Sequence, residues 1–222
     1  MGKRKLINNG VISNIINYTT NQKLTIYMQL NVYLISNPII SKLSHQIIYS
    51  AEKKNNIYID IQCQLNLFLI YETLKKWIKI ENIYIKNIDH IKKKCIFDTQ
   101  ESHLLLTNIQ DCSNIISNIK TILPKLYIVH TCIDEKTKQY ININDDYLGK
   151  DIINTIKKQK IIIIQTLLNN NSIIQLLNYL TLNHKINVNA IKIICTGCTT
   201  NILEMISNEY PSLEIYTTQI ID

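Results

Sequence analysis

Apolar residues in the second half of the chain alternate between two kinds of spacing. The stretch Ile161–Ile164 is a run of isoleucines bounded by polar residues, which is typical of a strand buried on both faces. The apolar residues after it recur at helical spacing and predict one helix face: Ile173, Ile174, Leu176, Leu177 and Leu180. A strand, a polar loop and a helix in this order form the layout of a phosphate site, because loop N–H groups and a helix N-terminus attract anions.

The same alternation predicts the remaining elements of this half. Further strands are expected over His103–Asn108, Leu126–Ile133, Ile191–Cys195 and Leu213–Thr217. Helices are expected over Ile115–Leu123, capped near Asp111 or Ser113 and ended by Pro124, and around Ile202–Ile206. Repeated strand–helix units with short connections favour a doubly wound parallel α/β sheet of about five strands.

Ligands of such sheets lie at the carboxyl ends of the strands. We therefore expect three loops to lie side by side at that edge: Asn108–Asn114, Gln165–Ser172 and Gly197–Asn201. The loop after the isoleucines contains no glycine, carboxylate or basic residue, so any anion there would be held by backbone N–H groups.

The first half of the chain is less regular. Residues 1–26 are polar and rich in Asn, and predict a loosely attached basic arm before a single domain over residues 27–222. Helical spacing predicts helices over Ile39–Lys54 and Ile61–Trp77, which carry more apolar residues than one packed face needs. We therefore expect a homodimer that uses this region. Short apolar stretches near 83–88 and 95–97 predict an antiparallel hairpin, with Lys92–Lys94 at its tip.

Composition limits the class of protein and its origin. The 222 residues are 46% hydrophobic and carry a net charge of +7, which suits one domain with a full core and leaves an anionic partner open. Ile and Asn are far above ordinary usage, while Gly falls to 4 residues and Pro to 3. This usage indicates an AT-rich genome, as found in organelles, endosymbionts and certain parasites. We expect a plastid-encoded protein of the stroma, with a cytoplasmic protein as the alternative. Apolar runs fall short of the roughly 18 residues that span a bilayer, so we expect no membrane partner.

The last part of the chain resembles a known family. Residues Ile191–Ile220 read I-K-I-I-C-T-G-C-T-T-N-I-L-E-M-I-S-N-E-Y-P-S-L-E-I-Y-T-T-Q-I. This stretch resembles, without a gap, the pattern I-K-x-x-x-x-x-A-A-P-E-G-x-x-x-L-x-x-x-H-P-x-x-x-x-Y-T-A-x-I-D of the uracil phosphoribosyltransferases. Shorter matches follow in the family's order at Asn37–Ile40, Leu67–Leu74 and Leu123–His130. The resemblance implies a type I phosphoribosyltransferase fold and transfer of ribose phosphate from phosphoribosyl pyrophosphate to uracil, which forms UMP.

The chain departs from the family where phosphate and ribose would bind. The family loop D-P-x-x-A-T-G-G-S corresponds to Gln165–Ile173, so that the neutral Gln165 replaces the carboxylate that would hold the ribose hydroxyls. The degraded phosphate loop consists of four residues: Asn169, Asn170, Asn171 and Ser172. Asn tolerates the left-handed backbone better than other non-glycine residues, so part of an anion nest could survive. The alternative is that Asn merely fills loops in an AT-biased sequence.

Two further departures concern pyrophosphate and uracil. Gln110 stands where the family's P-x-L-R-A-G loop has its arginine, and the chain's single arginine, Arg4, lies on the arm. The printed sequence ends at Asp222, before the Gly-rich segment that covers uracil in the family. We therefore expect little or no catalysis and assign no catalytic residue. A phosphorylated ribose remains a candidate ligand, and Mg²⁺ would be needed only if activity survives.

Other candidate sites carry weaker patterns. Cys195 and Cys198 have C-x-x-C spacing without a second pair or nearby histidines, so we expect reduced thiols rather than a zinc or redox site. No histidine has a partner at the spacing of a catalytic triad. Two alternative functions remain open: a residually active uracil phosphoribosyltransferase, and a nucleic-acid-binding protein that uses its lysines, which the near absence of Arg disfavours.

Overall fold

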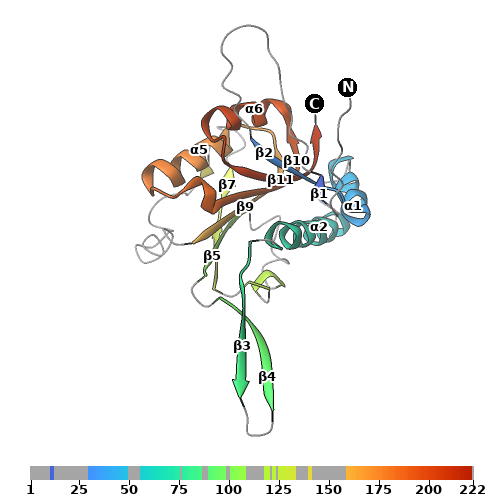
Figure 1. Cartoon of the computed structure of the whole chain (residues 1–222). Helices are drawn as coiled ribbons and strands as arrows, with labels where there is room; N and C mark the ends of the chain where they lie inside the picture. Colours follow the sequence, from blue (N-terminus) through green and yellow to red (C-terminus); the bar gives the residue numbers. More distant parts are fainter. Residues whose placement is uncertain are drawn as a thin grey trace, which may run out of the picture.

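A seven-stranded sheet forms the centre of the molecule (Figure 1). The computed structural model describes residues 11–12, 30–49, 56–75, 77–86, 90–98, 101–108, 118–120, 122–123, 125–133, 140–141 and 159–221. Across the sheet the strands follow the order β1 (Val11–Ile12), β2 (Asn31–Ile35), β11 (Glu214–Ile221), β10 (Ile191–Thr199), β9 (Lys160–Leu168), β5 (His103–Thr107) and β6 (Leu126–His130). Among these described strands six run parallel, and β1 pairs antiparallel with β2. The predicted doubly wound parallel fold is confirmed.

Helices cover both faces of the sheet (Figure 1). α1 (Pro38–Tyr49) and α2 (Asn56–Leu74) pack on one face, while α5 (Ser172–Asn178), the π-helical segment Tyr179–Asn183 and α6 (Thr200–Glu209) pack on the other. Successive side chains of β9 alternate between the two cores, since Ile161 and Ile163 join the α5/α6 side and Ile162 and Ile164 join the α1/α2 side. All four are at most 4% exposed, so the predicted strand buried on both faces is confirmed.

The predicted helices are present with shifted ends. Of the helix predicted over Ile39–Lys54, the structure describes α1 over Pro38–Tyr49, and residues 50–54 lie outside the described residues. α2 begins earlier than predicted, at Asn56. The apolar stripe predicted after β9 is buried throughout: Ile173, Ile174, Leu176, Leu177 and Leu180. Of the helix predicted over Ile115–Leu123, the structure describes helical residues 118–120 and 122, while Asp111, Ser113 and Pro124 lie outside the described residues. No helix in the described part of the chain is long and apolar enough to span a membrane.

Several strands differ from the prediction. β10 continues to Thr199 and α6 begins at Thr200, so the loop predicted over Gly197–Asn201 does not exist. The strand predicted over Leu126–Ile133 is divided, because β7 (Cys132–Ile133) leaves the central sheet and pairs with β8 (Tyr140–Ile141). β2 was not predicted, and β1 adds two residues of the N-terminal arm to the sheet.

The predicted antiparallel hairpin is formed by β3 (Ile80–Lys86) and β4 (Ile91–Phe97), and it projects from the body below the sheet (Figure 1). The placement of Lys92–Lys94 at its tip is wrong. These three residues lie inside β4, where they pair with Ile85, Tyr84 and Ile83 of β3. Both faces of this ribbon are exposed, so consecutive charged residues can continue the strand without a burial cost.

A buried lysine, Lys192, lies at the amino edge of the sheet, where α2 ends, together with partly buried charged side chains. The ammonium of Lys192 lies 4.8 Å from the centroid of the Trp77 ring and 4.9 Å from that of Tyr216. It also donates to the Tyr216 hydroxyl at 2.9 Å and pairs with Glu214 at 2.6 Å. Burial, followed by the hydrogen bond to Glu214, raises the pKa of Tyr216, and the ring stacks on Tyr33 at 4.7 Å.

Lys160 makes a second set of contacts with the same tryptophan. Its ammonium lies 5.4 Å from the centroid of the Trp77 ring and bonds to the Trp77 carbonyl and to the Glu101 carboxylate. Two lysines from neighbouring strands therefore fix the segment that joins α2 to the hairpin. The name "amino-edge cluster" is used below for Trp77, Glu101, Lys160, Lys192, Glu214 and Tyr216.

Replacing Glu214 by Gln should lower the free energy of unfolding by about 1–3 kcal/mol, because the largely buried Lys192 loses its carboxylate partner. Glu209→Gln, at an exposed position of α6, is the matched control and should change stability by less than about 0.5 kcal/mol. Urea unfolding of both variants measures the difference. Equal stabilities of the two variants would show that the Glu214 carboxylate does not stabilise the fold.

Candidate functional site

The carboxyl edge of the sheet holds the starting points of two of the predicted loops. β5 and β9 are parallel neighbours, so the residues that follow Thr107 and Leu168 leave the sheet at the same edge. β9 is the longer strand: Thr107 pairs with Ile164, and β9 continues for the residues Gln165–Leu168 beyond this pair. Of the loop predicted over Asn108–Asn114, Asn108 is described, and Gln110 lies outside the described residues.

Gln165 lies in β9 and not in a loop. It is half-buried and pairs in register with Cys195 of β10. The alternation of β9 places it on the face that also carries Ile161 and Ile163 and that α5 and α6 cover. The loop at this edge is therefore shorter than predicted, and consists of Asn169–Asn171 between β9 and α5.

The side chain of Asn170 turns back onto its own loop. Its Oδ1 accepts hydrogen bonds from the backbone N–H of Ser172, at 3.2 Å, and from the Ser172 hydroxyl. Ser172 is 1% exposed, so both of its donor groups are satisfied inside the protein. An anion at this loop would have to displace Asn170 to reach either donor.

The asparagines do not adopt the left-handed backbone that the nest hypothesis required. Among the described non-glycine residues, positive φ angles occur at Lys125 and Lys185, and Asn171 has φ −73° and ψ −5°. α5 begins at Ser172 without a side-chain cap from Asn171. The conformational argument for a surviving anion nest at Asn169–Asn171 is therefore wrong, while the use of these residues as ligands stays a prediction.

Apolar side chains close over the end of β10. A Cβ placed on Gly197 would lie 2.7 Å from Cδ1 of Ile221, and 3.3 Å from both Cδ1 of Ile48 and Cδ2 of Leu167. These side chains come from β11, α1 and β9, so three elements converge on this glycine. On the same face, the Gln62 amide of α2 donates to the Thr166 hydroxyl at 2.5 Å.

The two cysteines of the C-x-x-C sequence lie within β10 and are both buried free thiols. The hydrogen bond with Cys198, together with burial, raises the pKa of the Cys195 thiol well above its ordinary value. Cys195, whose thiol stays protonated, is therefore a poor nucleophile and a poor metal ligand, whereas the hydrogen bond with Cys195 lowers the pKa of Cys198. Across the described residues no group of three or more His, Cys, Asp and Glu side chains is arranged to hold a metal.

Two of the described histidines pack against tyrosines outside the sheet. His45 lies against Tyr49 of α1 with ring centroids 4.5 Å apart. His184 packs edge-on against Tyr179 at 4.6 Å. These ring contacts give both histidines an ordinary packing role.

Two other histidines belong to the sheet itself. His103 begins β5 at the amino edge and is buried. His130 ends β6 at the carboxyl edge, where it pairs in register with Thr107, and β5 separates it from β9.

The sequence did not reveal two sets of polar contacts: the amino-edge cluster and the Gln62–Thr166 pair. The residues that form these contacts are far apart in the chain, so no local pattern indicates them.

Comparisons with known proteins support the fold. No family model matches the sequence, and no curated protein matches it. Among solved structures, the AQ2163 protein from Aquifex aeolicus is similar at a TM-score of 0.63 and 13% identity, covering 85% of this chain and 86% of that one. This likeness shows a shared fold.

Two other similar structures are named phosphoribosyltransferases. A point mutant of hypoxanthine phosphoribosyltransferase from Trypanosoma cruzi, complexed with the product IMP, is similar at a TM-score of 0.39 and 10% identity over 74% of this chain and 73% of that one. Another structure of that enzyme gives a TM-score of 0.36 and 9% identity, covering 73% of this chain and 77% of that one. At these TM-scores the coarse likeness to phosphoribosyltransferases carries no argument about activity.

Replacing Gly197 by Val should lower the free energy of unfolding by about 1–3 kcal/mol, because the branched side chain overpacks the contact with Ile221. Adding Ile221→Ala should restore part of this loss, since the closest atom belongs to Ile221. Denaturant unfolding of the two single variants and the double variant measures the coupling. Strict additivity of the two changes would contradict the contact.

Proposed function

We propose that this chain is a diverged homologue of the uracil phosphoribosyltransferases that no longer forms UMP at a useful rate and retains at most weak affinity for phosphorylated ribose. The sequence resemblance to that family suggests the ancestry, and the parallel sheet is compatible with it. The main support for lost catalysis is the internal hydrogen bonding of Asn170 with Ser172, which occupies donors that a phosphate would need.

The position of Gln165 supports the same proposal. A ribose-binding carboxylate at the carboxyl edge would make charge-assisted hydrogen bonds worth about 1.5–3 kcal/mol. Gln165 carries no charge, and it lies within β9. Losing this contact and the arginine that Gln110 replaces would remove about 2 kcal/mol each from transition-state stabilisation, and so slow the reaction roughly a thousandfold.

The proposal includes where the protein is encoded and where it acts. The AT-rich usage of Ile and Asn favours a plastid-encoded chain that works in the stroma.

Large apolar side chains exposed on α1 and α2 favour a homodimer: Ile39, Tyr49, Ile57, Phe68 and Tyr71. A protein of this kind would act as a folded binding or regulatory partner and not as a catalyst.

Asn170→Asp tests whether the loop still binds phosphate. Aspartate keeps an acceptor for Ser172 but adds a negative charge, so the dissociation constant for phosphoribosyl pyrophosphate with Mg²⁺ should rise at least about tenfold, or 1.4 kcal/mol. Asn187→Asp is the matched control, because Asn187 also accepts a hydrogen bond from the backbone N–H two residues later, at 2.9 Å, but at an exposed turn away from this edge. Isothermal titration calorimetry measures both, and equal affinities would place any binding elsewhere.

The unmodified protein, given uracil, phosphoribosyl pyrophosphate and Mg²⁺, should form no UMP above background. A radiolabelled-uracil assay at high protein concentration measures this directly. Robust UMP formation would overturn the proposal and establish a residually active enzyme instead. Detectable binding in the titration without turnover would support a retained ligand site, and no binding at millimolar ligand would leave the fold as the only inherited property.

A further inference from the structure

The two cysteines of the C-x-x-C sequence lie on the same face of the sheet, although their spacing predicts opposite faces. Side chains of a regular strand alternate, so residues three positions apart face opposite ways. Cys195 and Cys198 nevertheless both belong to the core on the α5/α6 side. Gly197, which regular alternation would place on the side of Cys195, instead faces Ile48 of α1, since a Cβ there would lie 3.3 Å from Cδ1 of Ile48. The alternation of β10 therefore changes between the two cysteines.

The neighbouring strands make the same change at the same level. On β9, Ile163 and Leu168 are five positions apart, and both belong to the core on the α5/α6 side. On β11, Ile215 lies in this core and Ile220 packs against it. The three strands keep one continuous register through the change. The change is therefore built into the sheet and is not confined to β10.

The two thiols share a small polar site within this apolar core. A hydrogen bond joins the thiols of Cys195 and Cys198, and the fully buried hydroxyl of Thr217 is a hydrogen-bond partner of each. The Cys198 thiol also donates to the Gln219 carbonyl, with Sγ and O 3.8 Å apart. The name "dithiol site" is used below for these four residues. Two sulfurs that bond to each other in this way need only a small movement to meet.

The two thiols differ in reactivity. The hydrogen bond with Cys195 lowers the pKa of the Cys198 thiol, whereas the same bond, followed by burial, raises the pKa of Cys195. The thiolate is the form that attacks an oxidant, so Cys198 is the first to react. Cys195 stays protonated beside it as a second thiol. A cysteine of lowered pKa next to a second thiol is the arrangement in which oxidation ends in a disulfide.

We propose that Cys195 and Cys198 form a reversible disulfide when the folded protein meets hydrogen peroxide. The Cys198 thiolate attacks one peroxide oxygen and breaks the O–O bond, which gives a sulfenic acid and a hydroxide that takes up the proton lost by the thiol. The Cys195 sulfur then displaces the hydroxyl group from the sulfenic sulfur, and this group leaves as water with the Cys195 proton. Two thiols and one peroxide thus give one disulfide and two waters.

Closing the disulfide changes the carboxyl end of β10. A disulfide joins Cα atoms about 4.4–6.8 Å apart, whereas three residues of extended strand span about 10 Å. The backbone between the cysteines must therefore leave the extended form, and the bond is strained and readily reduced. α6 begins at Thr200, two residues after Cys198, so its first turn is displaced. The dithiol site thus couples the redox state of the solution to the carboxyl edge of the sheet, whatever ligand binds there.

Access to the dithiol site requires local opening. Both cysteines are 1% exposed, so peroxide reaches Cys198 only when the covering side chains move. The helix nearest in the chain is α6, and its N-cap residue Thr199 makes no side-chain hydrogen bond to the first turn. Helix ends open locally without global unfolding. Oxidation should therefore be slow but complete in the folded protein, and urea below the unfolding transition should accelerate it.

Peptide mass spectrometry tests the disulfide. A chain with Cys95→Ser, which removes the exposed thiol of β4, is treated with hydrogen peroxide, and free thiols are then blocked with iodoacetamide. Trypsin cleavage after Lys192 releases Ile193–Asp222, which contains no further lysine or arginine. This peptide should be lighter by two hydrogen atoms and carry no blocking group. Dithiothreitol should restore both thiols.

Single substitutions separate the two cysteines. Cys195→Ser should leave Cys198 as a sulfenic acid, which dimedone traps, because the second thiol is missing. Cys198→Ser should leave Cys195 unoxidised under the same conditions. A titration of the chain that keeps both cysteines, with mixtures of reduced and oxidised glutathione, needs no substitution in the core. It should show one two-electron transition of the same peptide.

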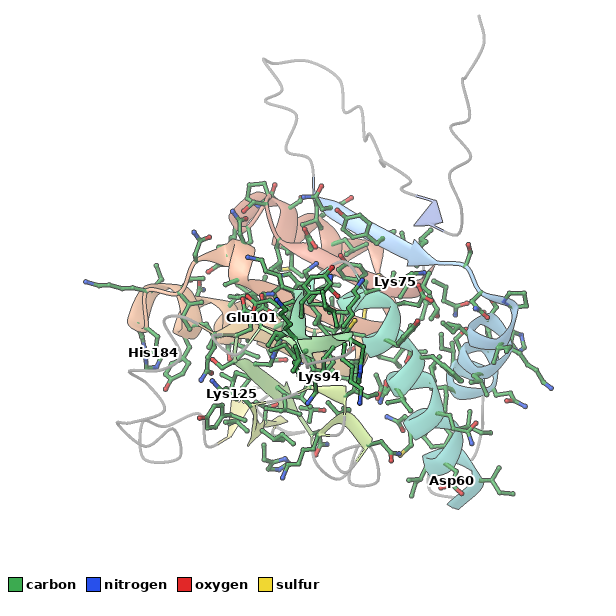
Figure 2. The ribbon with its side chains drawn as sticks, turned by 60° about the horizontal axis from the view of Figure 1, so that its bottom comes forward. Asp60, Lys75, Lys94, Glu101, Lys125 and His184 are labelled. Atoms are coloured by element: carbon green, nitrogen blue, oxygen red, sulfur yellow. The ribbon has the colours of Figure 1, made fainter. Side chains whose placement is uncertain are left out.

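Cys95 is the matched control for reactivity in the unmodified chain. It is exposed on β4, where its thiol bonds to Asn82 Oδ1 at 3.2 Å. Figure 2 shows the preceding residue, Lys94, on the hairpin that comes forward, while α5 and α6 lie at the other end of the molecule in Figure 1. Dimedone should trap Cys95 after peroxide treatment, and Cys195→Ser should not change its rate.

Hydrogen–deuterium exchange tests the effect on the carboxyl edge. In the oxidised protein, amides of the first turn of α6, Thr200–Leu203, should exchange at least about tenfold faster than in the reduced protein. Amides of the β3–β4 hairpin should exchange at the same rate in both. Equal exchange of the first turn in a protein shown to carry the disulfide would refute the coupling.

Two results would overturn the disulfide itself. One is that both thiols of Ile193–Asp222 stay free while Cys95 of the unmodified chain is oxidised. The other is that Cys198 proceeds to a sulfinic acid with Cys195 still free, which would show that the second thiol cannot reach it.

Discussion

The burial of β9 on both faces is the constraint on which the rest of the structure depends. This strand pairs with β5 on one side and with β10 on the other, and its four isoleucines belong alternately to two separate cores. Neither helical layer can form its core without it, because α1 and α2 pack on Ile162 and Ile164 while α5 and α6 pack on Ile161 and Ile163. The strand order and the position of the carboxyl edge follow from this central placement.

The elements that the sequence predicted well are those with a strong apolar period. Ile161–Ile164 and the stripe after them have no alternative that buries as many side chains, so both were predicted with the correct type. β2 was missed because Asn31–Ile35 has no clear period, and its pairing with β11 joins residues far apart in the sequence. The extension of β10 was missed because Thr196, Gly197 and Thr199 resemble loop residues. In the structure Thr196 is buried, and side chains of α1, β9 and β11 close over Gly197.

The candidate site was predictable in place but not in conformation. Strand order places the ends of β5 and β9 at one edge, which the alternation of strands and helices already implied. Whether Gln165 lies in a strand or a loop depends on its register with Cys195, and the inward turn of Asn170 depends on a local hydrogen bond. The spacing of residue types in the sequence shows neither the register of Gln165 nor the hydrogen bond of Asn170. The same asparagines were therefore compatible with a loop that binds an anion and with a loop that bonds to itself.

α2 connects the two edges of the sheet. Near its start Gln62 bonds to Thr166 toward the carboxyl edge, and just beyond its end Trp77 packs under Lys192 at the amino edge. A helix of this length transmits axial displacement almost unchanged, because its backbone hydrogen bonds resist compression. A sliding movement of α2 would therefore have to break its contacts at both edges together. A displacement of the segment at the base of the hairpin along the α2 axis would therefore be coupled to the Gln62–Thr166 contact on β9.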